Sequence, residues 1–180
     1  MSTLKKLTSQ TAVYGLSSVV GRFLNYLLVP IYTRYFTPSD YGVVTELYSY
    51  VAFLFVLLTY GFETAFFRFS KKHQKTKSVY STALISILFS SIIFVSIIYY
   101  NALSISSWMG FGVEANFIQW FSIIIGLDAI SSISFAQLRE QEKALRFTFI
   151  RLLNIFINIG FNIYFIVYKG FGIQYIFIFN

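Results

Sequence analysis

The feature that most constrains this chain is a long run, Val79–Tyr100, that contains no charged residue. An α-helix needs about 20 mostly apolar residues to cross the hydrocarbon core of a bilayer, which is about 30 Å thick. Four other stretches reach that length, each with a single charged residue (Arg22, Glu46, Asp128 or Arg151). These four stretches are Thr11–Tyr32, Gly42–Gly61, Phe117–Ala136 and Phe147–Tyr168. The sequence therefore predicts five complete transmembrane helices.

A sixth apolar stretch begins at Phe171 and reaches Asn180 after about ten residues, which is too short to cross a bilayer. We therefore expect that the chain stops inside its sixth helix. The two-residue alternation of a β-barrel is not evident, and a helix in lipid satisfies its own backbone hydrogen bonds. The predicted fold is an all-α integral membrane protein, a polytopic helix bundle. Residues 1–180 are expected to form a single transmembrane domain, an incomplete N-terminal bundle.

The composition argues against most soluble functions. Charged residues make up 12% of the chain and hydrophobic residues 57%, whereas an average soluble domain has about 25% charged residues. Cysteine is absent and His73 is the single histidine, which excludes disulfides, zinc thiolate sites and thiol nucleophiles. The sequence also lacks a P-loop, a G-x-G-x-x-G motif and an H-E-x-x-H motif. We therefore expect no cofactor, no metal site and no enzymatic activity.

The net charge of +7 is explained by membrane topology. If the N-terminus is cytoplasmic, the inner segments are residues 1–10, 62–78 and 137–151, and they hold most of the lysines and arginines. These are Lys5, Lys6, Arg68, Lys71, Lys72, Lys75, Lys77, Arg139, Lys143, Arg146 and Arg151. The outer connections hold only Arg34 and Lys169. Because cytoplasmic connections are enriched in Lys and Arg, the N-terminus is predicted to be cytoplasmic, and no nucleic-acid partner is expected.

Polar residues recur along the first predicted span. They follow one another at steps of three and four residues, which places them on one helix face. These residues are Gln10, Tyr14, Ser18, Arg22 and Asn25. An arginine at mid-bilayer costs about 2.5–3.5 kcal/mol on insertion scales and usually faces a bundle interior or a watery cavity. Arg22 and Asn25 are therefore candidate cavity residues.

A second polar stripe follows one side of the fifth predicted span. It consists of Arg151, Asn154, Asn158 and Asn162, and asparagine is uncommon where a helix faces lipid. The fourth span adds Asp128 at a depth similar to that of Arg22. Two interpretations stay open. In the first, Arg22 forms a structural ion pair with Asp128 or, as a less favoured partner, Glu46. In the second, Arg22 and the stripe line a cationic cavity that suits an anionic, polyhydroxylated substrate.

Small polar residues also lie on one face of the third span. Thr82, Ser86 and Ser90 are four residues apart. Small residues let transmembrane helices approach closely. We therefore expect this face to pack against another helix rather than to bind substrate.

Two segments carry a resemblance to a known family. The run Leu27–Gly42 (LLVPIYTRYFTPSDYG) and the run Tyr60–Phe69 (YGFETAFFRF) resemble the opening of the polysaccharide-biosynthesis flippases, the Wzx-like, O-antigen branch of the MOP (MATE-related) superfamily. In the first run, Thr37, Pro38 and Asp40 also predict a helix that starts close to Pro38, because they suit an N-cap and the first turn.

The resemblance implies about twelve to fourteen helices in two pseudo-symmetric bundles around a central cavity. It implies a protein of the bacterial cytoplasmic membrane that moves undecaprenyl-diphosphate-linked oligosaccharide to the outer leaflet by alternating access. The implied partners are this anionic lipid-linked oligosaccharide, membrane lipids, and polymerase or assembly proteins of the polysaccharide pathway. Arg22 and Arg151 are the positions that could contribute to the cationic cavity of such a protein.

Three alternatives stay open. A multidrug or cation extruder of the same superfamily would be expected to place acidic residues in its cavity, and Asp128 is the single deep one. A membrane enzyme of glycan assembly, such as a polymerase or ligase, usually carries a large outer loop with charged catalytic residues. A membrane-anchored structural subunit would not require polar stripes on three helices.

Overall fold

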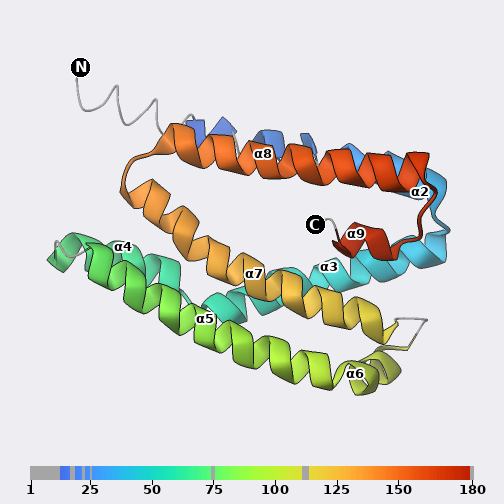
Figure 1. Ribbon diagram of the computed structural model, residues 1–180, viewed down its shortest axis with the longest axis horizontal. Coiled ribbons are helices and arrows are strands. Elements are labelled where there is room, and N and C mark those ends of the chain that lie inside the picture. Colours follow the sequence, from blue (N-terminus) through green and yellow to red (C-terminus); the bar gives the residue numbers. More distant parts are fainter. Residues whose placement is uncertain are drawn as a thin grey trace. The chain divides into compact units, whose positions relative to one another are not determined.

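The computed structural model describes residues 13–16, 19–21, 23–24, 26–73, 76–110 and 114–178. Within these residues every regular element is helical (Figure 1). The chain divides into two compact units. A central unit contains Ser39–Gln137, and a terminal unit combines Met1–Pro38 with Leu138–Asn180. The all-α prediction is therefore confirmed for the part of the chain that the structure describes.

The central unit is built from long apolar helices. They are α3 (Pro38–Thr59), α4 (Phe62–His73), α5 (Thr76–Tyr100), the short α6 (Ala102–Met109) and α7 (Ala115–Glu140), whose last residues belong to the terminal unit. Helix α3 begins at Pro38, as predicted, because a proline at the first helical position loses no backbone hydrogen bond. Tyr60 and Gly61 have φ angles of 28° and 77°, and they separate α3 from α4.

The terminal unit contains α2 (Leu28–Tyr35), α8 (Ala144–Asn162), a π-helical segment η1 (Ile163–Tyr168) and α9 (Gln174–Ile178). The described residues before Leu27 are helical and pack along α8. The ring of Tyr14 lies 5.1 Å from that of Phe147, a Cβ on Gly21 would meet the side chain of Ile155, and α2 contacts η1. These contacts follow the same order along the N-terminal helical residues and along α8 and η1, so the two segments run parallel.

Among the described residues, four helices are long and apolar enough to cross a membrane. They are Pro38–Lys71, Lys77–Tyr100, Ala115–Glu140 and Ala144–Tyr168. In the most apolar 18-residue stretch of each helix, only 17% to 39% is buried, so most of the apolar surface of these helices is exposed. Apolar surface of that extent marks contact with a membrane or with other protein. The four helices are therefore those of a membrane-embedded protein.

The four helices coincide with the predicted second to fifth spans, but each begins earlier in the sequence, ends later, or both. The predicted first span falls partly on residues outside the described ranges, so the count of five complete spans stays a prediction. The sixth stretch was predicted to start at Phe171, and among its described residues, 171–178, the helix covers Gln174–Ile178. Gly170, with a φ of 66°, lies in the connection that precedes it.

Helix α7 provides the core of the central unit. Its buried face includes the small residues Ser122, Gly126 and Ala129, and this spacing lets a neighbouring helix approach closely. A Cβ on Gly126 would lie 2.7 Å from Cγ2 of Val95 on α5. The hydroxyls of Tyr80 and Ser134 also join α5 to α7 at 3.2 Å.

The packing face predicted for α5 is displaced by one residue. The buried residues are Ala83, Ile87 and Ser91, whereas Thr82 is exposed and Ser86 and Ser90 are half-buried. One residue corresponds to a rotation of about 100° around a helix. The expectation that Thr82, Ser86 and Ser90 make the helix contact is therefore wrong, although a small serine does lie at it.

Candidate functional site

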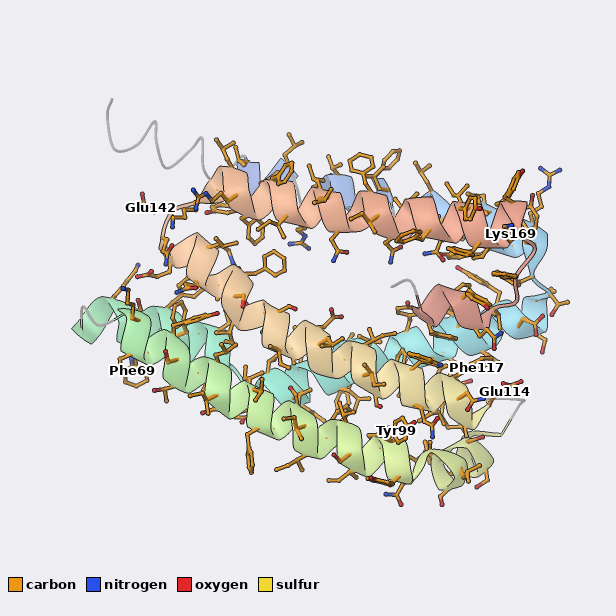
Figure 2. The ribbon with its side chains drawn as sticks, in the orientation of Figure 1. Phe69, Tyr99, Glu114, Phe117, Glu142 and Lys169 are labelled. Carbon is orange, nitrogen blue, oxygen red and sulfur yellow. The ribbon has the colours of Figure 1, made fainter. Side chains whose placement is uncertain are left out.

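The polar stripe on α8 changes from exposed to buried along the helix. Arg151 and Asn154 are exposed, Asn158 is 8% exposed and Asn162 is 1% exposed. Figure 2 shows α8 between Glu142, at the turn that precedes it, and Lys169, beyond its far end. The buried end of the stripe is therefore the end nearer Lys169.

The two buried asparagines are bonded to each other. Nδ2 of Asn162 donates to the backbone oxygen of Asn158 at 2.9 Å and to its Oδ1 at 3.2 Å. Oδ1 of Asn162 is buried without a hydrogen-bond partner among the described residues. An unsatisfied buried acceptor costs about 1–3 kcal/mol. Such a group is a candidate acceptor for a donor that lies outside the described residues, on the chain or on a ligand.

An unusual helical turn begins directly after this pair. Residues Ile163–Tyr168 are π-helical, and π-helical turns are rare and often lie at functional sites. The aromatic residues that follow stack on one another. The ring of Phe171 lies 5.6 Å from that of Phe165 and 4.5 Å from that of Tyr175. This stack holds α9 against η1, beyond the buried end of the stripe.

A cluster of two arginines and two aromatic rings lies at the other end of α8. The guanidinium carbons of Arg139 and Arg151 lie 5.7 Å and 5.8 Å from the centre of the Phe147 ring. Phe147 is buried and Tyr14 meets it edge to face. Cations within about 6 Å of an aromatic ring are attracted to its face. The buried ring therefore attracts both guanidinium groups.

The turn between α7 and α8 brings Arg139 into this cluster. Glu142 has a φ of 55°, and the backbone N–H of Lys143 donates to Leu138 at 3.0 Å. The chain thereby reverses within three residues, so the end of α7 lies beside the first turns of α8. Sequence reasoning assigned Arg139 to the cytoplasmic charge bias alone. Its spacing from Phe147 gives no signal of a contact, because the contact depends on the reversal.

The structure does not bring the other predicted site residues into this cluster or stripe among the residues that it describes. Arg22 and Asn25 lie outside the described residues, so their place in the cavity stays a prediction. Asp128 is exposed on α7 in the central unit and makes no hydrogen bond or ion pair with any described residue. The predicted pair between Arg22 and Asp128 is therefore not tested. Within the described ranges, no three His, Cys, Asp or Glu residues are grouped so as to hold a metal ion.

The site can bind an anion and hydroxyl groups. Guanidinium groups form paired hydrogen bonds to phosphate oxygens, and asparagine amides both donate and accept hydrogen bonds. Arg151 belongs to both the arginine cluster and the polar stripe. One face of α8 therefore presents positive charge at one end and amide groups further along.

Comparison with known proteins identifies one related family. A family described as polysaccharide biosynthesis protein matches residues 31–179. This range includes α8 with its stripe, Arg139 and Phe147, and it excludes Arg22. No curated protein and no solved structure matches the chain.

Proposed function

Because the chain belongs to the family of polysaccharide biosynthesis proteins, we propose that it is part of a flippase for lipid-linked oligosaccharide. The substrate is an oligosaccharide carried on undecaprenyl diphosphate. The protein moves it from the inner to the outer leaflet of the bacterial cytoplasmic membrane. In this proposal the N-terminus is cytoplasmic, and the chain supplies helices of one bundle in a transporter of two.

The observation that carries the proposal is the polar face of α8. A helix that only anchors a protein in lipid gains nothing from Asn158 and Asn162, which are buried in an otherwise apolar span. Polar residues at membrane depth are costly and usually line a substrate pathway. Amide groups suit the hydroxyls of a sugar, and Arg139 and Arg151 suit the diphosphate. A lipid-linked oligosaccharide has both of these chemical parts.

Transport explains this face better than glycan catalysis does. Glycosidic chemistry commonly uses a pair of carboxyl groups, one acid and one base or nucleophile. On α8 the polar side chains are those of arginine, asparagine and Thr148, and none of them is a carboxyl group. A drug or cation extruder is also less well supported, because two guanidinium groups lie against the Phe147 ring and the nearby carboxylate of Glu142 balances only one of them.

The proposal is tested by restoring polysaccharide export in cells that lack the gene. The full-length protein is compared with its Arg151→Ala and Asn158→Leu variants and with Lys169→Ala, a control at the other end of α8. Lys169 is exposed, so its replacement is expected to leave export unchanged. Surface glycan, intracellular lipid-linked oligosaccharide and the amount of protein in the membrane are measured together.

We expect the two site variants to reduce surface glycan and to accumulate lipid-linked oligosaccharide inside the cell. A variant that accumulates no precursor but stops polymerisation would favour a polymerase or ligase. Normal export by well-expressed Arg151→Ala and Asn158→Leu proteins would refute the role given to this face.

A further inference from the structure

A hollow lies in the central unit, between α4 and α5. It has a volume of about 390 Å³, within the range of about 300–1,000 Å³ found for small-molecule sites. Its wall on α4 has the helical spacing i, i+3, i+4, i+7, and its wall on α5 comes from the first turns of that helix. The lining residues are Phe62, Ala65, Phe66, Phe69, Ser78, Val79, Thr82 and Ala83.

The wall of this groove is apolar although it includes hydroxyl residues. The hydroxyl of Thr82 donates to the backbone oxygen of Ser78 at 3.0 Å, so it is satisfied within its own helix. Phe66 is buried at the base of the groove, while Phe69 is 47% exposed and is labelled on α4 in Figure 2. The groove thus offers aromatic and aliphatic surface that is open at one side.

One end of the groove lies among positive charges. Arg68, Lys71 and Lys77 are exposed, and they flank the connection between α4 and α5. From Phe69 the groove extends along α4 to Phe62, which is about 10 Å at 1.5 Å per residue. Both helices belong to candidate membrane spans. The charged end is therefore at the level of lipid headgroups, and the apolar part lies deeper.

We propose that this groove binds an anionic glycerophospholipid of the cytoplasmic leaflet. One acyl chain lies against Phe62, Phe66 and Phe69, and the phosphate contacts the basic residues at the mouth. The argument for this occupant is charge complementarity, since a cationic mouth above an apolar groove matches an anionic head above a hydrocarbon chain. The cytoplasmic leaflet is rich in anionic lipid, and each nearby Lys or Arg adds about 1 kcal/mol of attraction. The inference does not depend on the proposed transport function.

The test uses full-length protein in which phenylalanine replaces every native tryptophan, among them Trp108 and Trp120. A single tryptophan is then introduced by Phe69→Trp, at the groove. A matched control carries Phe53→Trp on α3, where Phe53 is 66% exposed and no basic residue is near in sequence. Each protein is reconstituted in phosphatidylcholine bilayers, and brominated phosphatidylglycerol or brominated phosphatidylcholine is added as a quencher.

We expect brominated phosphatidylglycerol to quench the tryptophan at position 69 with an affinity about fivefold or more above that of brominated phosphatidylcholine, since one basic residue supplies about that factor. The tryptophan at position 53 should show no such preference. The charge variants Arg68→Gln, Lys71→Gln and Lys77→Gln, combined in one protein, should remove the preference, whereas the distant Lys169→Gln should not.

Equal quenching by both lipids at position 69 would overturn the proposal. The same preference at positions 53 and 69 would also overturn it, because it would reflect a general surface effect. A preference that survives the combined Arg68→Gln, Lys71→Gln and Lys77→Gln variant would show that the basic mouth does not select the lipid. If the charge variants fail to fold, the comparison of positions 69 and 53 still decides the question.

Discussion

Replacing Asn162 by leucine is expected to leave the protein as stable as before, or to stabilise it, while it stops transport. Asn162 is 1% exposed and lies next to the π-helical turn. Its side chain has about the size of leucine, so the exchange opens no large cavity. The prediction separates a polar residue that is kept for function from one that is kept for folding.

The magnitude follows from the hydrogen bonds of this side chain. The substitution removes two bonds to Asn158, at 2.9 Å and 3.2 Å, each worth about 0.6 kcal/mol by the average for membrane proteins. It also removes the buried Oδ1, which has no partner among the described residues and whose burial costs about 1–3 kcal/mol. The balance is a gain of about 0–2 kcal/mol in the free energy of unfolding.

The assay measures the free energy of unfolding of the full-length protein by titration with sodium dodecyl sulfate in mixed micelles. Asn154→Leu is the matched control, because Asn154 lies on the same stripe but is exposed. A substitution at an exposed position usually changes stability by no more than about 0.5 kcal/mol. Export of surface glycan is measured on the same variants.

A loss of more than about 1 kcal/mol in Asn162→Leu would refute the reasoning, because it would exceed the two bonds counted above even with no relief from the unsatisfied oxygen. The asparagine would then be structural. Full transport by a stable Asn162→Leu protein would contradict the functional half of the prediction.

Three further outcomes are expected. Gly126→Ala should be about 1–3 kcal/mol less stable than the control Gly160→Ala. The added Cβ would lie 2.7 Å from Val95, whereas nothing lies within 4 Å at Gly160. Thermal unfolding should show the difference in stability, and the additional substitution Val95→Ala should reduce it. Phe147→Leu should lower stability by about 1–3 kcal/mol, because the ring contacts two guanidinium groups and is buried; equal melting temperatures would contradict this. Arg151→Lys should transport less than wild type but more than Arg151→Ala, because lysine keeps the charge without the paired hydrogen bonds. Equal transport rates of wild type and Arg151→Lys would exclude a role for the guanidinium.

Hydropathy alone predicted the long helices well, because crossing a bilayer requires both apolar composition and length. It placed their ends less well. Helix α4 continues to His73 and α5 starts at Thr76, both beyond the apolar stretches. Polar residues can continue a helix outside the hydrocarbon core, and hydropathy does not detect that part. The short helix α6 lies in a connection where the length of the apolar stretch gives no signal.

The rotation of each helix was harder to predict. In lipid, the surface that faces other helices is about as apolar as the surface that faces acyl chains, so periodicity does not separate them. This is why Thr82, Ser86 and Ser90 were chosen for the contact in place of Ala83, Ile87 and Ser91. Only groups whose burial is costly, such as Asn158 and Asn162, mark the inner side of a helix in the sequence.

The arginine cluster shows what a single sequence does not contain. Arg151 was a candidate because of its depth, but Arg139 was not, since its role depends on the turn at Glu142 and on the buried ring of Phe147. Contacts of this kind follow from the path of the chain between helices.

The most direct test of the account is a translocation assay in proteoliposomes. Full-length wild-type protein and the variant Asn158→Leu with Asn162→Leu are reconstituted with a lipid-linked oligosaccharide, and access of a membrane-impermeant enzyme to the sugar is followed over time. The account predicts that wild-type protein moves the sugar across the bilayer and that the folded variant does not. A folded wild-type protein that moves no lipid-linked oligosaccharide, or a variant that moves it at the wild-type rate, would contradict the central claim.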